Sequence, residues 1–334
     1  MPPREVVAGI PDFVAGRVFG GTSRMGAPES AATAAPAAEP GAGGPDALPP
    51  VVCVVNDRYS GPVCVLLQSI ADAHGPASDL RVIVLHRSRS LSGWARERIL
   101  FHADRVGLRV ELRRVADPPA HLPLFGRLTE DAYLRLMMPV VLADIPLALY
   151  LDADLLVLDD LRPLMATSLH GAPLAAVRDA VNPVLAAGRA LPGFSRLGLA
   201  ASREYFNSGV MMLDLAACRG VFDDAHRFMR ERPEHVALGD QDALNVAVAD
   251  GWRRLERRWN TFAMAAWTGL EDWSYRCEAV LPLATLVEDE RSAAILHYPG
   301  PLKPWQATYP VSAGKQRYRS VAARIEEGES GADL

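Results

Sequence analysis

The sequence predicts an α/β protein with a Rossmann-like first half and a mixed β-sheet flanked by helices. Three observations lead to this prediction. A short β-branched run at Val51–Val55 is typical of a strand buried on both faces of a parallel sheet. Apolar strand-like runs then alternate with amphipathic segments up to residue 151. Beyond Asp154 the apolar runs become shorter and more scattered, so we expect one mixed sheet.

Composition divides the 334 residues into a leader, a folded domain and a tail. Residues 26–50 are almost entirely Ala, Pro, Gly and Glu, and such a segment cannot bury enough apolar area to offset the entropy of ordering. We expect a flexible leader at 1–50, a folded domain at 51–310 with halves at 51–155 and 156–310, and a C-terminal helix with an acidic tail at 311–334.

The first half is expected to alternate strands and helices. Pro62 opens the first helix, because proline fits the first helical turn, and the apolar residues that follow it share one face. The next expected elements are a strand at 80–85, a helix around 91–101, a strand near 108–115, a helix around 131–138 and a strand at 147–151. The first hundred or so ordered residues are therefore expected to be Rossmann-like.

The second half offers weaker signals. The expected strands lie at 174–177, 209–213 and 294–296, and a helix is expected from about Asp240 to Asp250. Gly251 suits the C′ position that ends this helix, and its first turn carries acidic residues that favour a helix N-terminus.

Charge and cysteine usage exclude several classes of protein. The formal net charge of −5 comes from 40 acidic and 35 basic residues without a basic block, which argues against nucleic acid as a partner. The four cysteines form no CxxC pair, so we expect reduced core thiols in a cytoplasmic protein. We expect no secretory signal. The apolar stretch 134–151 is interrupted by charged and proline residues, so we also expect no transmembrane segment.

Two carboxylates follow the last strand of the first half, in the segment LYLDAD at residues 149–154. Ligands of open α/β sheets bind at the carboxyl ends of the strands. Side chains two apart in a strand point the same way, so Asp152 and Asp154 are expected to face one divalent cation. The alternative is that the two acids only end a strand and begin a turn.

Three further segments place polar side chains at the ends of strands or at the start of a helix. They are YFNSGVMM at 205–212, GDQD at 239–242 and HYPGPLKPW at 297–305. Each also has a structural explanation: Asn207 as a turn former, Asp240 or Asp242 as a helix cap, and Lys303 as a solvated surface residue.

His297 decides which metal is expected at this site. A metal held by Asp152, Asp154 and His297 favours Mn²⁺ over Mg²⁺, because a nitrogen ligand suits metals later in the first transition row. Mg²⁺ remains the alternative. Lys303 follows His297 closely and is expected to meet a diphosphate oxygen as a point charge.

With these segments in this order, the chain resembles glycosyltransferase family 8, the retaining group that includes bacterial lipopolysaccharide galactosyl- and glucosyltransferases and glycogenin. The resemblance spans about Val51 to Trp305. It implies a GT-A fold with a nucleotide-binding half at 51–155 and a sugar and acceptor half at 156–310. It also implies a UDP-sugar donor, of galactose or glucose, and Mn²⁺ held by the Asp-x-Asp pair and the late histidine.

The resemblance assigns a role to each matched position. Asp152, Asp154 and His297 match the metal ligands. The nucleotide and diphosphate are expected at Asn56, Asp57, Tyr59, Asp152, Ala153, Gly300 and Lys303. The donor sugar is expected at Arg135, Asp179, Asn207, Asp240 and Gln241. The expected catalytic group is Gln241, Asp240 and Asp179, with Gln241 near the anomeric carbon. Because an amide is a poor nucleophile, we expect same-face attack through an oxocarbenium-like state.

The chain departs from the family pattern in two places. The family usually has Asp at the position of Asn56 and Asn at that of Arg58, which weakens the expected preference for uridine. Membrane-associated bacterial members tend to carry a basic and aromatic tail, whereas residues 325–329 are acidic. A soluble acceptor hydroxyl, as on a natural product, is therefore expected, with a lipopolysaccharide or surface glycan as the alternative.

Two other functions compete with the transferase. An apolar strand that ends in Asp-x-Asp also occurs in phosphohydrolases and phosphomutases, but there the motif lies near the start of the fold and is usually followed by Thr rather than Leu155. A catalytically silent protein that binds a sugar nucleotide or a glycan is the second alternative, which the changed Asn56 and Arg58 keep open.

Overall fold

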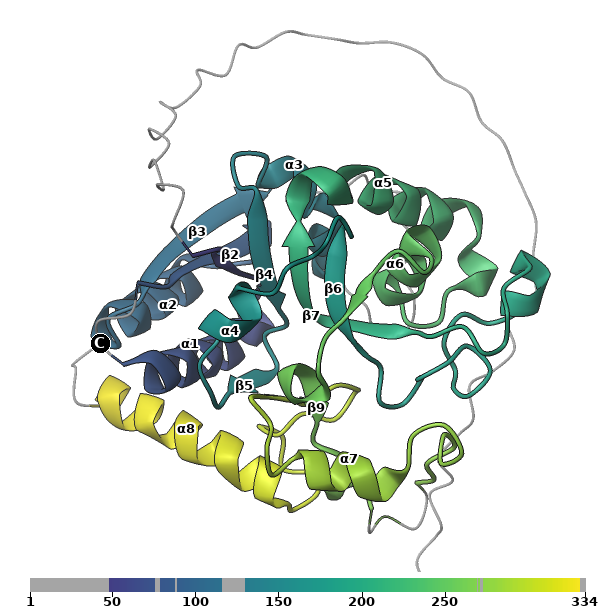
Figure 1. Ribbon diagram of the computed structural model, residues 1–334. Helices are drawn as coiled ribbons and strands as arrows, with labels where there is room; N and C mark the ends of the chain where they lie inside the picture. Colours follow the sequence, from purple (N-terminus) through teal and green to yellow (C-terminus); the bar gives the residue numbers. More distant parts are fainter. Residues whose placement is uncertain are drawn as a thin grey trace, which may run out of the picture. The chain divides into compact units, whose positions relative to one another are not determined.

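The computed structural model describes residues 48–75, 79–87, 89–115, 130–268, 270 and 273–330 (Figure 1). The chain divides into two units, Met1–Ala42 and Gly43–Leu334, and the first lies outside the described residues. Nearly all of the flexible leader predicted at 1–50 therefore falls outside them as well. The predicted domain boundaries stay a prediction.

A seven-stranded mixed sheet forms the centre of this unit. Its strands are β1 (Val51–Val54), β2 (Arg81–Arg87), β3 (Arg109–Val115), β4 (Leu147–Leu151), β6 (Leu174–Arg178), β7 (Phe206–Asp214) and β8 (Arg253–Arg254). They lie in the order β3-β2-β1-β4-β7-β6-β8. The first four run parallel, whereas β7 is antiparallel to both β4 and β6. The chain order reverses between β1 and β4, and open α/β folds bind their ligands at such a point.

Helices cover both faces of the sheet. They are α1 (Ser60–His74), α2 (Gly93–Arg105), α3 (Met138–Val141), α4 (Arg162–Met165), α5 (Leu215–Glu231), α6 (Asp240–Val248), α7 (Leu283–Asp289) and α8 (Ala313–Ser330). Alternation along β1 sends Val51 and Cys53 into the core beneath α1 and α2, and Val52 into the opposite core beneath α5 and α6. The Rossmann-like first half is thus confirmed.

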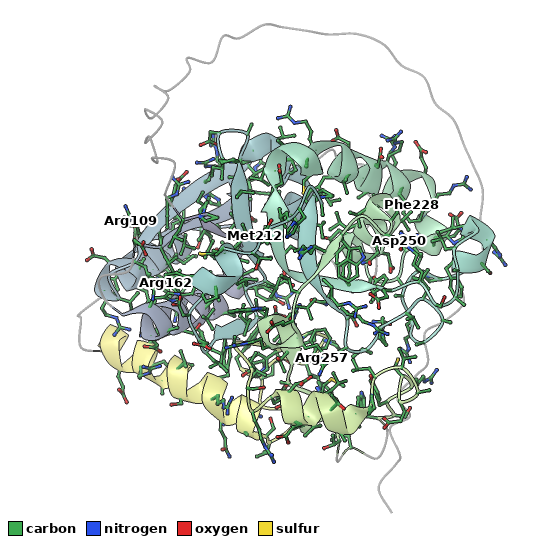
Figure 2. All side chains as sticks on the ribbon, viewed as in Figure 1. Arg109, Arg162, Met212, Phe228, Asp250 and Arg257 are labelled. Carbon is green, nitrogen blue, oxygen red and sulfur yellow. The ribbon has the colours of Figure 1, made fainter. Side chains whose placement is uncertain are left out.

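Side-chain positions follow this layered arrangement. In Figure 2, Met212 on β7 lies in the interior, whereas Arg109, Arg162, Asp250 and Arg257 lie on exposed positions. The four cysteines, Cys53, Cys64, Cys218 and Cys277, are buried and form no disulfide with one another, as the sequence predicted. None of the helices in the described ranges is long and apolar enough to cross a membrane.

The prediction of one sheet is wrong, because three short strands form a second sheet. These strands are β5 (Leu155–Val157), β9 (Thr261–Phe262) and β10 (Ile295–His297), in the order β5-β10-β9. The chain turns after β4 and leaves the main sheet, so β5 packs under α1 instead. There the buried Ser69 hydroxyl of α1 accepts a hydrogen bond from Val157 N at 3.0 Å.

Two predicted helices end or begin elsewhere than expected. Where an α-helix was predicted at 131–138, the chain forms the 3₁₀ helix η2 (Glu130–Met137), and α3 begins only at Met138. Pro139 cannot donate the backbone hydrogen bond that would continue an α-helix across this point. The helix predicted to reach Asp250 stops at Val248, so Gly251 is not its C′ residue. The remaining 3₁₀ helices are η1 (Asp57–Tyr59), η3 (Phe194–Leu197), η4 (Pro233–His235), η5 (Arg257–Asn260) and η6 (Met264–Ala266).

Candidate active site

The predicted site residues gather where the carboxyl end of β4 meets the amino end of β7. Asp152 follows β4, and its backbone N–H donates to Gly209 O on β7 at 2.8 Å. This bond extends the antiparallel ladder in which Leu151 pairs with Val210. The ladder brings the segment around Asn207 beside the Asp-x-Asp pair, although the two are far apart in sequence.

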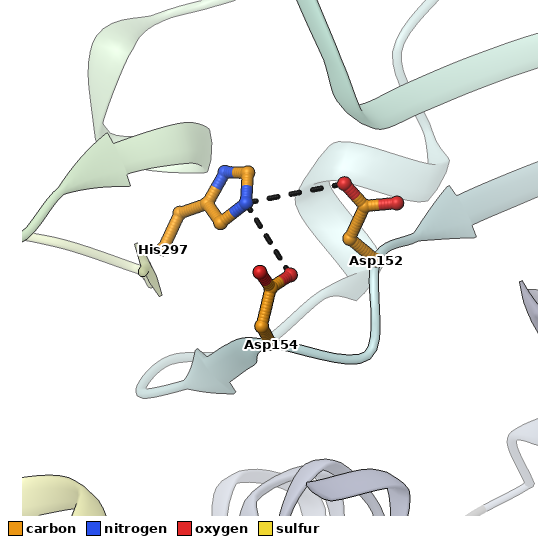
Figure 3. A group of neighbouring side chains, drawn as sticks. All are labelled: Asp152, Asp154 and His297. Carbon is orange, nitrogen blue, oxygen red and sulfur yellow. Dashed lines mark ion pairs between the residues drawn. The ribbon is translucent and has the colours of Figure 1, made fainter. Parts of the chain in front are cut away.

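Asp152, Asp154 and His297 form a triad that could hold a metal ion (Figure 3). His297 Nε2 lies 3.5 Å from Asp154 Oδ1 and 3.9 Å from Asp152 Oδ2. One ligand atom from each residue lies within 4.8 Å of the others. His297 and Asp154 are buried, while the Asp152 side chain is 25% exposed and keeps one side of the triad open to solvent.

The three residues of the triad are brought together by a turn and by the pairing of β5 with β10, and not by the alternation of side chains along a single strand. Asp152 and Asp154 lie beyond the end of β4, in the turn that leads into β5, so the predicted alternation within a strand is not what brings them together. β10 pairs antiparallel with β5, and His297 lies opposite Leu155. The next residue, Tyr298, donates its backbone N–H to Asp154 O at 3.1 Å.

The donor set fits a divalent first-row metal. Two carboxylate oxygens and one imidazole nitrogen suit such ions, whose bonds of about 2.0–2.2 Å place opposite ligands about 4.4 Å apart. Gly209 keeps the space beside the triad clear. A Cβ atom at this position would lie 2.5 Å from His297 Cε1 and 2.8 Å from Asp152 Oδ2.

Lys303 contacts Asp154, one of the three residues of the triad. Its ammonium group forms a buried ion pair with Asp154 Oδ2 and donates to Tyr298 O at 2.9 Å. Burial disfavours the ionised carboxylate, but Lys303 and His297 outweigh that effect and hold the pKa of Asp154 well below its usual range. The structural alternative of Lys303 as a solvated surface residue is therefore wrong.

Arg135 links the triad to the start of α6. Its Nη2 atom lies 3.2 Å from Asp152 Oδ1, and its Nε lies 3.1 Å from Asp240 Oδ2. Tyr150 also donates its hydroxyl to Asp152 Oδ1 at 2.7 Å, and the Arg135 guanidinium lies over its ring. Burial raises the pKa of Asp240 to about 6, although Arg135 lowers it. Among the described residues, neither Arg135 Nε nor Asp240 Oδ2 has a well-oriented hydrogen bond.

A buried amide and carboxylate network lies beside this cluster. Gln241 Oε1 accepts from Asn207 Nδ2 at 2.9 Å and from Ser208 N at 3.0 Å, and Gln241 Nε2 donates to Asp179 Oδ2 at 3.2 Å. Asp179 also accepts from Asn207 and, through its other oxygen, from the backbone N–H groups of residues 181 and 182. Every polar end of this network already has a partner inside the protein.

The predicted nucleotide-binding residues lie around the ends of β1 and β10. Asn56 caps η1 by accepting from Tyr59 N at 3.3 Å, and Asp57 accepts from the backbone N–H of Ser92 at the start of α2. The Tyr59 ring packs edge-on against Trp305, with 5.7 Å between ring centroids. Ala153 is buried in the turn between the two aspartates, and Gly300 adopts a φ of 92°, which glycine tolerates best. Their roles toward a nucleotide stay predictions.

Asp242 belongs to the fold rather than to the site. Its side chain is fully buried and accepts from the backbone N–H groups of residues 191, 237 and 238 and from the Tyr205 hydroxyl. These bonds fasten two loops to the first turn of α6. The N-cap residue of α6 is Gly239, so neither Asp240 nor Asp242 occupies the cap position itself.

The sequence interpretation missed four residues that support the site. Tyr150, Ser208 and Gly209 lie inside the motifs that were singled out, but nothing marked them as neighbours of Asp152, Arg135 or the triad. Asn260 lies outside every motif, at the end of η5. Its only sequence signal is a polar residue just before a short apolar run.

A family model described as glycosyl transferase family 8 matches residues 114–309. General stress protein A of Bacillus subtilis (strain 168) is 30% identical over 190 residues, and the lipopolysaccharide 1,2-glucosyltransferase of Escherichia coli (strain K12) is 29% identical over 214 residues. The alignments cover 54% and 62% of this chain and 61% and 60% of those proteins. The chain thus spans about three fifths of the length of these two relatives.

The fold is similar to that of solved glycosyltransferases. The galactosyltransferase LgtC, crystallised with donor and acceptor sugar analogues, matches with a TM-score of 0.66 at 26% identity. The match covers 84% of this chain and 99% of that one. The apo structure of the bifunctional glycosyltransferase WbbM matches with a TM-score of 0.67 at 20% identity, over 86% of this chain and 53% of that one. The GT-A fold class is thus confirmed.

The buried bonds of Asp242 predict a structural rather than a catalytic defect on substitution. Asp242→Asn replaces one acceptor oxygen by an NH₂ group that faces a backbone N–H donor, so we expect the free energy of unfolding to fall by about 2–3 kcal/mol in urea denaturation. Asp250→Asn is the matched control, because Asp250 is exposed just after the same helix. Equal stability of the two variants would contradict the structural role.

Proposed function

This chain belongs to glycosyl transferase family 8, and we propose that it is a metal-dependent, retaining hexosyltransferase that uses a UDP-sugar. The observation that carries this proposal is the convergence of Asp152, Asp154 and His297 beside the buried network around Gln241. A diphosphate held at the triad would place the attached sugar toward that network. Galactose and glucose are the proposed donor sugars, in line with the Escherichia coli glucosyltransferase and the galactosyltransferase LgtC that this chain resembles.

The triad would hold Mn²⁺, with Mg²⁺ as the alternative. When bound, the metal supplies positive charge that stabilises the departing diphosphate. Lys303 lies within reach of the same region through its ion pair with Asp154, and Gly300 provides a turn without a side chain. We assign these two residues to the diphosphate, and the turn at Asn56, Asp57 and Tyr59 to the base and ribose.

Among the residues assigned to the donor sugar, we propose Arg135 and Asp240 as those that bind a sugar hydroxyl. Both present a buried polar atom that has no well-oriented hydrogen bond among the described residues, and a sugar hydroxyl can donate to one and accept from the other. Asp179, in contrast, has both oxygens occupied, so we assign it mainly to holding Asn207 and Gln241 in place.

The chemistry we propose is same-face displacement rather than a double displacement. Gln241 would lie near the anomeric carbon, but its amide oxygen already accepts from Asn207 and Ser208, which lowers its capacity to act as a nucleophile. The Gln241 oxygen would instead stabilise positive charge on the sugar ring. The leaving phosphate oxygen would take the proton of the acceptor hydroxyl.

We propose a soluble acceptor and a cytoplasmic location. The exposed acidic residues Glu326 and Glu327 on α8 do not favour an anionic lipid surface. Thiols stay reduced in the cytoplasm, and the four cysteines form no disulfide with one another. A lipopolysaccharide or surface-glycan acceptor is the second candidate, favoured by the similarity to the lipopolysaccharide 1,2-glucosyltransferase of Escherichia coli.

A donor panel tests the proposed activity. The protein is incubated with UDP- and GDP-linked hexoses and Mn²⁺, and release of the nucleotide is followed with and without a chelator. We expect slow hydrolysis of UDP-galactose or UDP-glucose that stops when the metal is removed. Release of phosphate from a simple sugar phosphate would point to a phosphohydrolase. Binding of donors without turnover under any condition would point to a silent binding protein.

Asp154→Asn removes one carboxylate of the triad and the partner of Lys303. We expect donor hydrolysis to fall at least about a hundredfold, with a folded protein by circular dichroism, because charge stabilisation of the leaving group is lost. Asp223→Asn, at an exposed position of α5, is the control that should retain full activity. Activity of Asp154→Asn at the level of this control would remove the metal role.

Gly209→Ala tests the space beside the triad. The added methyl group would lie within 3 Å of His297 and Asp152, so we expect Mn²⁺ affinity to fall at least about tenfold in a titration followed by electron paramagnetic resonance. Gly220→Ala on α5 is the matched control, because a Cβ there meets no atom within 4 Å. Unchanged Mn²⁺ binding by Gly209→Ala would place the ion elsewhere.

A further inference from the structure

We propose that Asn260 is a positioning residue that fixes which nitrogen of His297 carries the proton and connects the metal triad to Gln241. This inference rests on the proposed function, because it concerns the same metal site. It assigns a role to a residue that lies outside all the motifs recognised in the sequence.

The contacts form an unbroken chain. His297 Nδ1 lies 2.8 Å from Asn260 Oδ1, and Asn260 Nδ2 donates to Asn207 Oδ1 at 2.8 Å. Asn207 Nδ2 in turn donates to Gln241 Oε1 at 2.9 Å. All four side chains are at least nine-tenths buried, so water does not compete for these bonds.

An amide can be turned by 180° without changing its shape, so its orientation must be fixed by partners that cannot reverse. Asn207 has two such partners. The backbone N–H of Gly209 can only donate, and it donates to Asn207 Oδ1 at 2.9 Å. A carboxylate can only accept, and Asn207 Nδ2 donates to Asp179 Oδ2 at 3.1 Å. Asn207 therefore presents its oxygen, and not its nitrogen, to Asn260.

The direction of the remaining bonds follows from this orientation. Because Asn207 presents an oxygen, Asn260 must present its Nδ2, which leaves Asn260 Oδ1 facing His297. An oxygen can only accept, so His297 must carry its proton on Nδ1. Because this bond uses Nδ1, the other ring nitrogen, Nε2, faces Asp154 Oδ1 at 3.5 Å and is the one left to bind a metal.

The fold holds Asn260 and His297 side by side. Asn260 ends η5 and directly precedes β9, which pairs parallel with β10 so that Phe262 lies opposite His297. The Phe262 ring also packs edge-on against the imidazole, with centroids 5.3 Å apart. The imidazole thus has a fixed plane as well as a fixed protonated nitrogen.

Two substitutions of Asn260 test its hydrogen bond to His297 and its hydrogen bond to Asn207 separately. Asn260→Ala removes the acceptor of His297, so we expect Mn²⁺ affinity to fall about 10- to 100-fold, and added Mn²⁺ to restore part of the donor hydrolysis. Asn260→Asp retains an acceptor for Nδ1–H but loses the donor to Asn207. We expect this variant to bind Mn²⁺ within about threefold of the wild type and to show a lower kcat with an unchanged activation constant for the metal.

Thr261→Val is the control for a change of stability in the same segment. Thr261 is the buried neighbour of Asn260, and its hydroxyl donates to Arg257 O, away from the site. We expect Thr261→Val to bind Mn²⁺ as the wild type does. If Asn260→Ala binds Mn²⁺ as tightly as this control, the proposal is wrong.

A second measurement does not depend on the metal or on the Ala variant. In the metal-free protein, long-range ¹H–¹⁵N spectra should show the proton of His297 on Nδ1, and Asn260→Asp should leave it there. Absence of a proton from Nδ1 would overturn the proposal even if every variant folds and binds Mn²⁺ as expected. Failure of the wild type to bind Mn²⁺ would instead count against the proposed function, with the His297 spectrum still deciding the inference.

Discussion

The antiparallel pairing of β5 with β10 is the interaction on which the candidate site depends. Asp154 lies directly before β5, and His297 ends β10, so this short ladder alone determines their separation. β9 joins the same sheet and brings Asn260 to the other side of the imidazole. The large sheet supplies Asp152 and Gly209 through β4 and β7. The three residues that could hold a metal ion thus lie at the junction of two sheets, and each sheet contributes to them.

The sequence predicted the parts of this structure that strong local patterns encode. The β-branched run of β1 and the apolar run of β4 are long enough, and buried enough on both faces, to be recognised as strands. Polar residues at the ends of such strands then pointed to Asp152, Asn207 and His297. The family model begins at residue 114, so the departures at Asn56 and Arg58 lie outside the part of the chain that it matches.

Other features depend on tertiary contacts that leave no trace in a short window of sequence. β10 matches the strand predicted at 294–296, but its partners β5 and β9 have only three and two residues, too few for a period to be read. The second sheet was missed for that reason. Gly209 resembles any glycine in a strand until His297 is placed against it. Asp240 and Asp242 are both acids in the first turn of α6, so the sequence does not distinguish them. In the structure Asp242 accepts hydrogen bonds from the backbone of neighbouring loops, whereas Asp240 pairs with Arg135.

The side chains around Asp179 are already hydrogen-bonded to one another in the folded protein, and this affects how much free energy is needed to order them when a substrate binds. Dehydrated amides and a carboxylate are unfavourable in a protein interior unless each is paired, and ordering them consumes conformational entropy. Here the unfavourable free energy is part of the free energy of folding, and burial of the apolar layers on both faces of the large sheet offsets it. A substrate would thus meet side chains already immobilised, and little of its own binding energy would be spent on arranging them.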